Sequence, residues 1–220
     1  MTNNRIYVDV NALVLFGATK THANIYCDVL NKTMTHYKIN ENLQRVSNFL
    51  GQVFIESGNL STVRENLTYT TPQRLMNVWP SRFKTIEQAM PFVRNPQALA
   101  NMVYSNRMGN INPGDGYKFL GRGLKQITGR DNYLKIGKAL NIDLMAQPQL
   151  LEEPLYAALS AGEYWNMING NRVADADIKE TTTIITKLVN GGYNGLQERI
   201  KKVNTIRRYY ENMDDQICKE

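Results

Sequence analysis

The sequence predicts a mainly α-helical fold. Along most of the chain, apolar residues recur every three to four positions, and no stretch shows the sustained alternation of a half-buried strand. Clusters of Gly, Pro and Asn separate these periodic segments. With 42% hydrophobic and 21% charged residues, the 220-residue chain has the composition of a globular protein, which excludes disordered and collagen-like classes. We expect one domain over residues 1–220, with a small lobe or insertion around residues 70–110.

The clearest helix is predicted between Asn40 and Gly58. Asn40 is a suitable cap residue, Glu41 places an acid in the first turn, and Gly58 is a stop signal. Between them, the apolar positions that form one face are Leu43, Val46, Leu50, Val53 and Phe54. The same signals predict further helices over residues 95–107, 130–140, 154–168, 177–189 and 196–210.

A glycine-rich segment, GNINPGDGYKFLGRG, spans residues 109–123. Its five glycines and one proline make it too irregular for a buried element, so we expect a functional loop or a long surface loop. The Lys-Ser/Thr ending of a phosphate-binding loop is missing, and no strand precedes the glycines as a dinucleotide-binding motif requires.

Several classes of protein are poorly supported. No run approaches the roughly 20 apolar residues of a membrane span, so we expect no transmembrane segment, and the first residues do not resemble a secretory signal. Cys27 and Cys218 form no CxxC pair, which argues against a disulfide framework and a thiolate metal site. His22 and His36 lack a metal-binding spacing. We therefore expect no metal and no cofactor.

The chain carries a net charge of +6, which favours anionic partners. Five cations crowd ten positions near the C-terminus: Arg199, Lys201, Lys202, Arg207 and Arg208. This basic segment is either a solvated helix face or a surface that binds an anionic polymer. No aromatic-interleaved RNA-binding motif accompanies it, so we expect no nucleic-acid partner.

One carboxylate interrupts the apolar pattern of the clearest helix. On a helical wheel, Glu56 lies at the edge of the apolar face, beside Phe49 and Val53. A carboxyl in that position is partly desolvated, and desolvation favours the protonated form that a general acid needs. Gln52 shares that side of the helix. The alternative is a helix-end carboxylate that points into water, although an acid in the last turn opposes the helix dipole.

A second carboxylate, Glu65, follows nine residues later in the polar stretch STVRENLTY. Its surroundings look wetter than those of Glu56. Two carboxyls in different environments can divide the roles of acid and base between them. The simpler alternative is an exposed loop acid that pairs with Arg64 or another base.

Four segments then carry a specific resemblance: FLGQVFIESGNL, REN-L-Y, GDGYKFLGRGLKQITGRDNY and VNGGYNGLQERI. They recur in this order in glycoside hydrolase family 19, and the chain resembles a chitinase-like bacteriophage endolysin of that family. The resemblance covers nearly the whole chain, since the opening VNALVLFGA is similar to the first helix of such endolysins. It implies a lysozyme-like helical glycosidase whose catalytic cleft lies between a large helical lobe and a smaller, loop-rich lobe.

The resemblance also implies roles for individual residues. It makes Glu56 the general acid, Glu65 the general base, and Thr128 the hydroxyl that helps to hold the attacking water. It places Arg199 where it organises the carboxylates. It places four further residues in contact with substrate: Tyr69, Gln126, Asn132 and Asn190. The position before the acid, commonly histidine in this family, is Ile55 here.

Each of these residues has a simpler alternative. Thr128 and Asp131 match a helix capping box. Asn190 followed by Gly191 matches the C-terminal cap of a helix. Arg199 belongs to the basic segment.

The family implies an inverting mechanism, in which the acid and base lie roughly 6.5–9.5 Å apart to leave room for a water molecule. We expect the substrate to be the glycan strands of peptidoglycan and the enzyme to be a monomer. It would wait in the host cytoplasm and reach the periplasm and cell wall at lysis. Alternatives are a chitinase, a lytic transglycosylase that uses Glu56 alone, a zinc amidase and a non-catalytic wall-binding module.

Overall fold

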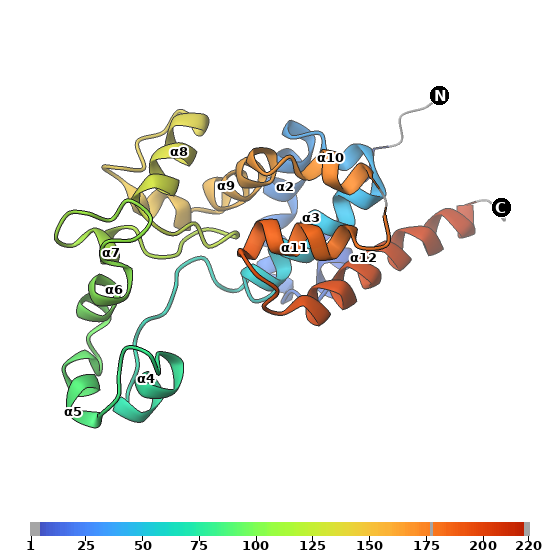
Figure 1. The fold of residues 1–220 in the computed structure, drawn as a ribbon. Helices are drawn as coiled ribbons and strands as arrows, with labels where there is room; N and C mark the ends of the chain where they lie inside the picture. Colours follow the sequence, from blue (N-terminus) through green and yellow to red (C-terminus); the bar gives the residue numbers. More distant parts are fainter. Residues whose placement is uncertain (1–4, 177, 218–220) are drawn as a thin grey trace. The chain divides into compact units, whose positions relative to one another are not determined.

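The computed structural model describes residues 5–176 and 178–217, and this part of the chain is mostly helical (Figure 1). The α-helices are α1 (Val10–Leu15), α2 (Lys20–His36), α3 (Leu43–Glu56), α4 (Pro72–Val78), α5 (Ile86–Ala89), α6 (Pro96–Tyr104), α7 (Asp115–Lys118), α8 (Arg130–Leu140), α9 (Pro154–Met167), α10 (Gly170–Asp175), α11 (Thr181–Asn190) and α12 (Leu196–Ile217). Short 3-10 helices span Ile39–Glu41, Met90–Phe92 and Pro148–Glu152. Across the described ranges, β-structure is limited to isolated bridges of Arg122 with Arg64 and Ile127. The predicted mainly α-helical fold is confirmed.

The chain forms two compact units. The first contains the residues up to Val63, the segment Gly123–Gln126 and the residues from Leu150 onward. The second contains Arg64–Arg122 and Ile127–Gln149. The chain therefore passes from one unit to the other four times. The expected arrangement of one domain with a small lobe around residues 70–110 stays a prediction.

The core of the first unit surrounds α3, which packs against α10, α11 and α12. The approach of α12 to α3 depends on Gly51, since a Cβ atom there would lie only 2.4 Å from Cγ2 of Val203. Close by, the rings of Phe16 and Phe54 meet edge to face with centroids 6.2 Å apart. This packing fixes the last turn of α3, where Glu56 lies.

The second unit has its own apolar cluster, built from α4, α5, α6 and their connections. Its buried members are Leu67, Leu75, Phe83, Ala89, Leu99, Ala100 and Val103. Elsewhere in this unit, the rings of Phe119 and Tyr133 lie 5.2 Å apart between centroids. These contacts hold the segment that carries Glu65.

Most predicted helices are present with shifted ends. The clearest one begins at Leu43, because Asn42 provides the cap by accepting a hydrogen bond from the Gln44 amide. Asn40 instead lies in the 3-10 helix before it. The helix expected from residue 177 begins only at Thr181, whose Oγ accepts from the Ile178 amide and donates to the Ile178 carbonyl. Asp177 lies outside the described residues.

The prediction that the glycine-rich segment is not buried holds for residues 111–114, which are exposed, and is wrong for its second half. Phe119, Leu120 and Arg122 are buried, and residues 115–118 form the short helix α7. Irregular backbone is tolerated inside a protein when its polar groups are bonded. Here the Leu120 carbonyl accepts from the Tyr133 hydroxyl at 2.6 Å, and the Arg122 amide donates to the Ile127 carbonyl at 3.0 Å.

The prediction of one exposed basic face on the last helix is also wrong for three of its five cations. Arg199 is 3% exposed, Lys202 donates to the Phe16 carbonyl, and Arg207 donates to the Gln44 side chain. These three turn inward because α12 packs along α3 and the residues around it. Only Lys201 and Arg208 of the basic segment are exposed.

Within residues 5–176 and 178–217, no helix combines the length and apolar character needed to cross a membrane. Cys27 is a partly buried free thiol that donates to the Val8 carbonyl at 3.4 Å. Cys218 lies outside the described residues.

Candidate active site

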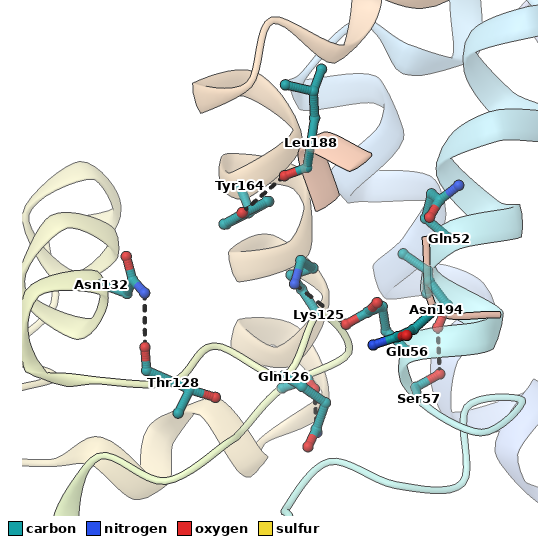
Figure 2. A network of polar contacts seen from close by, with 12 residues as sticks. Gln52, Glu56, Ser57, Lys125, Gln126, Thr128, Asn132, Tyr164, Leu188 and Asn194 are labelled. Carbon is teal, nitrogen blue, oxygen red and sulfur yellow. Dashed lines mark hydrogen bonds and ion pairs between the residues drawn. The ribbon is translucent and has the colours of Figure 1, made fainter. Parts of the chain in front are cut away.

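Glu56 is the last residue of α3, and its carboxylate is held by two cations, Arg199 and Lys125. Figure 2 shows Lys125 beside Glu56. Oε1 accepts from Nη2 of Arg199 at 2.6 Å, and Oε2 accepts from Nζ of Lys125 at 3.3 Å. The Glu56 side chain is 10% exposed, so its predicted burial is confirmed. The alternative of a carboxylate pointing into water is wrong. The helical wheel places Glu56 beside apolar residues. The groups bonded to its carboxylate, however, are two charged side chains.

Arg199 connects α12 to α3. Its Nη1 donates to Oε1 of Gln52 at 2.5 Å, and its Nε donates to the Asn194 carbonyl at 3.2 Å. Gln52 in turn donates to Oγ of Thr186 in α11 at 3.2 Å. A buried ion pair is tolerated when its remaining donors are also bonded, and this network provides that. Gln52 lies on the same side of α3 as Glu56, as predicted.

Lys125 is a site residue that the sequence does not predict. It lies in the segment Gly123–Gln126, which is fixed by hydrogen bonds from the Gly123 amide to the Val63 carbonyl and from the Leu124 amide to the Ala157 carbonyl. A Cβ atom at Gly123 would lie 2.9 Å from Oγ of Ser160, so this approach needs a residue without a side chain. The segment therefore delivers Lys125 to Glu56 by backbone anchoring. The sequence indicates this role only in that Lys125 directly precedes Gln126, a predicted site residue.

The ammonium group of Lys125 lies between a carboxylate and an aromatic ring. Its Nζ is 4.6 Å from the ring centroid of Tyr164 in α9, which is within cation–π range. Burial lowers the pKa of Lys125, and the negative charge of Glu56 acts in the opposite direction. Burial also raises the pKa of Tyr164, and the charge of Glu56 adds to that effect. Tyr164 donates its hydroxyl hydrogen to the Leu188 carbonyl at 3.3 Å (Figure 2).

Glu65 belongs to the second unit and has a different environment. Its Oε1 accepts from the Tyr104 hydroxyl at 2.6 Å, and its Oε2 accepts from the Gly121 amide at 3.3 Å. Its own amide donates to the Gly121 carbonyl at 2.8 Å, which fixes the backbone beside the carboxylate. Burial, followed by the charge of Glu65, raises the pKa values of both Tyr104 and Tyr69. Glu65 is thus partly buried and bonded by neutral donors.

A surface pocket of about 270 Å³ opens beside Glu65 within the second unit. Its wall includes Arg64, Asn66, Thr68 and Tyr117. A water or sugar hydroxyl can therefore approach this carboxylate. Another pocket, of about 510 Å³, lies along α8 and the loop after it, but it contains none of the predicted site residues.

The other predicted residues are distributed over both units. In the second unit, Tyr69 packs against Trp79 with centroids 5.1 Å apart, and Asn132 donates to the Thr128 carbonyl at 2.8 Å. In the first unit, Gln126 donates to the Gly123 carbonyl at 2.9 Å, whereas Asn190 ends α11. Figure 2 shows Gln126, Thr128 and Asn132 as sticks.

The structure decides between the simpler alternatives. Gly129, not Thr128, caps α8, and it makes no side-chain cap bond, so the capping-box alternative is wrong. The helix-cap explanation of Asn190 holds in part, because Gly191 follows with φ +75° and donates to the Lys187 carbonyl. Even so, Oδ1 of Asn190 is buried without a hydrogen-bond partner in the described part of the chain.

Comparison with known proteins now identifies the family. The chain is 36% identical over 156 residues to a glycosyl hydrolase family 19 domain-containing protein of Haemophilus influenzae, an alignment that covers 70% of this chain and 74% of the relative. The chain belongs to glycosyl hydrolase family 19. It is therefore a glycoside hydrolase. No family model matches the chain.

Two plant chitinases are more distant relatives. Chitinase 8 of Oryza sativa is 27% identical over 125 residues, and basic endochitinase CHB4 of Brassica napus is 31% identical over 114 residues. These alignments cover 49% and 51% of this chain but only 48% and 40% of the plant proteins. The chain thus spans half or less of the length of these plant enzymes.

Solved structures share the fold. Chitinase C from Streptomyces griseus HUT6037 matches with a TM-score of 0.60 at 20% identity, and the match covers 94% of both chains. A second bacterial family 19 chitinase matches with a TM-score of 0.57 at 20% identity, covering 91% of this chain and 93% of the other. The helical fold of family 19 chitinases is therefore also the fold of this chain.

Proposed function

We propose that this family 19 enzyme is a bacteriophage endolysin that hydrolyses β-1,4 glycosidic bonds of peptidoglycan and so lyses the host cell. The observation that carries the proposal is the presence of two partly buried carboxylates with different partners. Glu56 lies against two cations, whereas Glu65 accepts hydrogen bonds from a tyrosine and a backbone amide beside a pocket. The family resemblance makes Glu56 the acid and Glu65 the base, and the cations beside Glu56 stabilise the carboxylate that remains after it has donated its proton.

In this mechanism, Glu56 protonates the oxygen of the leaving sugar while Glu65 removes a proton from the attacking water. Glu56 ends the proton transfer as a carboxylate, and Arg199 stabilises that charge through its 2.6 Å hydrogen bond. Thr128 orients the water, and the amide and hydroxyl side chains of Tyr69, Gln126, Asn132 and Asn190 contact the sugars. The attack inverts the configuration at the anomeric carbon, so a β-linked glycan yields an α-anomer first.

Peptidoglycan is favoured over other glycans by charge. Its peptide stems carry carboxylates, and a protein with a net charge of +6 is attracted to such a polymer. We propose that the enzyme accumulates in the host cytoplasm as a monomer and reaches the wall at lysis. Chitin is the second candidate substrate, because the two plant relatives and the solved structures bear the name chitinase.

Digestion of purified sacculi and of soluble chitin oligomers, followed by mass spectrometry, tests the proposal. We expect saccharide fragments with ordinary reducing ends from sacculi, formed faster than any product from chitin. Anhydro-sugar ends would identify a lytic transglycosylase, and released peptides whose formation EDTA blocks would identify a zinc amidase. Cleavage of chitin alone would overturn the endolysin proposal and leave a chitinase. Binding to sacculi without any product would indicate a non-catalytic wall-binding module.

The exposed part of the basic segment is expected to assist binding to the wall. Reversing the charge of Lys201 and Arg208 together should weaken sacculus binding at low salt, because both side chains are exposed and face an anionic polymer. The difference should shrink near 0.5 M salt, where the Debye length falls to about 4 Å. Sedimentation with sacculi measures this effect.

The matched control reverses Lys32, an exposed lysine of α2 that pairs with Asp28. Hydrolysis of a short neutral oligosaccharide should be unchanged in the double variant, since neither residue contacts Glu56 or Glu65. Equal low-salt binding of the folded double variant and the parent enzyme would show that this face is only solvated.

A further inference from the structure

Both oxygens of Glu56 are occupied by different cations, and the two cations come from different parts of the first unit. Arg199 reaches Oε1 from α12, and Lys125 reaches Oε2 from the segment Gly123–Gln126. Arg199 is already bonded to Gln52 and to the Asn194 carbonyl, so it is fixed independently of Lys125. Lys125 therefore places a second positive charge beside Glu56. A substitution can remove this charge while Arg199 stays in place.

The groups that face this carboxylate can be named element by element. Arg199 faces it from α12, Lys125 from the segment Gly123–Gln126, and Tyr164 from α9, while the neutral Gln52 shares α3 with it. Lys125 contributes a cation at 3.3 Å from Oε2 and is itself only 14% exposed. Water therefore screens the interaction between these two charges poorly.

We propose that Lys125 is a positioning residue that holds the second oxygen of Glu56 and stabilises the carboxylate that forms when this side chain gives its proton to the leaving oxygen. This inference rests on the proposed role of Glu56 as the acid. A nearby cation stabilises the ionised carboxylate relative to the protonated form. The same charge makes proton donation easier, because it stabilises the carboxylate that forms as the leaving oxygen takes the proton.

A purely structural role accounts poorly for this lysine. Burial of its ammonium group is costly, which is why its pKa is lowered. An apolar residue of similar length would fill the space against Tyr164 without that cost. The anchoring of the segment itself comes from the backbone of Gly123 and Leu124 rather than from the amine. The charge of Lys125 is thus better explained by its effect on Glu56 than by stability.

The test compares kcat and KM of Lys125→Met, Lys125→Gln and Lys125→Arg on one soluble fragment with those of the parent enzyme. In the two neutral variants, we expect kcat to fall roughly tenfold, because the developing carboxylate loses one of its two stabilising cations while Arg199 remains in place. KM should stay unchanged, since the charge acts on Glu56 rather than on the bound sugars. Lys125→Arg should restore kcat. Lys32→Met removes an exposed charge and should leave both parameters unchanged.

Glu65 keeps its own partners, Tyr104 and the Gly121 amide, in every variant, so a change in kcat reports on the acid. A folded neutral variant with the parental kcat overturns the proposal. Complete inactivity of both folded neutral variants overturns it as well, because the amine would then take part in the reaction. Failure of both to fold shows a structural role instead. If Glu56→Gln were fully active, the proposed function would fail first.

Discussion

Replacing Glu56 by Gln is expected to remove almost all glycosidase activity. The amide has nearly the same shape but cannot protonate the leaving oxygen, and general acid catalysis typically contributes about 10²–10⁴-fold to the rate. The measurement is the initial rate on purified sacculi and on a soluble fragment of them. Glu211→Gln, an exposed change on α12, is the matched control and should keep the parental rate.

The same substitution should lower the stability of the fold. Glu56 neutralises two largely buried cations, so its loss leaves Arg199 and Lys125 without a counter-charge. Hydrogen bonds to charged groups contribute about 1.5–3 kcal/mol, and we expect a decrease of that size in the free energy of unfolding. Domains are typically stable by about 5–15 kcal/mol, so the variant should still fold. Parental activity in the folded variant, verified by circular dichroism and thermal melting, would show that Glu56 is not the acid.

Replacing Glu65 by Gln is expected to have the second largest effect. It removes the group that accepts the proton from water, a loss of about 10²–10⁴-fold, while the amide oxygen can still accept a hydrogen bond from Tyr104. The fold should therefore change little. Single-turnover experiments on one soluble fragment should show a lower rate constant for bond cleavage. Binding of the fragment, measured separately, should have a similar affinity.

Thr128→Ala is the comparison for that result. Losing a hydroxyl that only orients water removes one hydrogen bond, worth about 0.5–1.5 kcal/mol, so the rate should fall much less than in Glu65→Gln. Thr128→Ser should be nearly normal. If Thr128→Ala were as inactive as Glu65→Gln, or if Glu65→Gln were fully active, the assignment of the base and its water would be wrong.

The position of the acid could be read from the sequence because it depends on a local pattern. The apolar stripe of α3 is formed by residues within four turns, and Glu56 lies at its edge. The partner Arg199 came from a family resemblance, since nothing in its local sequence distinguishes it from its basic neighbours. Only the tertiary packing of α12 on α3 turns it inward.

Other parts of the site were not predictable from local patterns. Lys125 meets Glu56 across 69 positions, and Tyr104 meets Glu65 across 39. The glycine-rich segment appeared exposed because its composition is typical of loops. Its burial depends on distant groups such as the Tyr133 hydroxyl, whose bond to Leu120 exists only in the folded chain. By contrast, α2 is readable from a local pattern, because its buried Ala23, Tyr26, Leu30 and Met34 recur at helical spacing, and its absence from the predicted helices is an error.

The ion pair between Glu56 and Arg199 also has a consequence for synthesis and folding. Its two residues are separated by 143 positions, and the second lies in α12. Contacts between distant residues form late, because the intervening chain must first be ordered. A nascent chain lacks this guanidinium until residue 199 has been synthesised. The acid therefore acquires its principal partner long after its own helix has been made, and chains that stop before Arg199 are expected to be enzymatically inert.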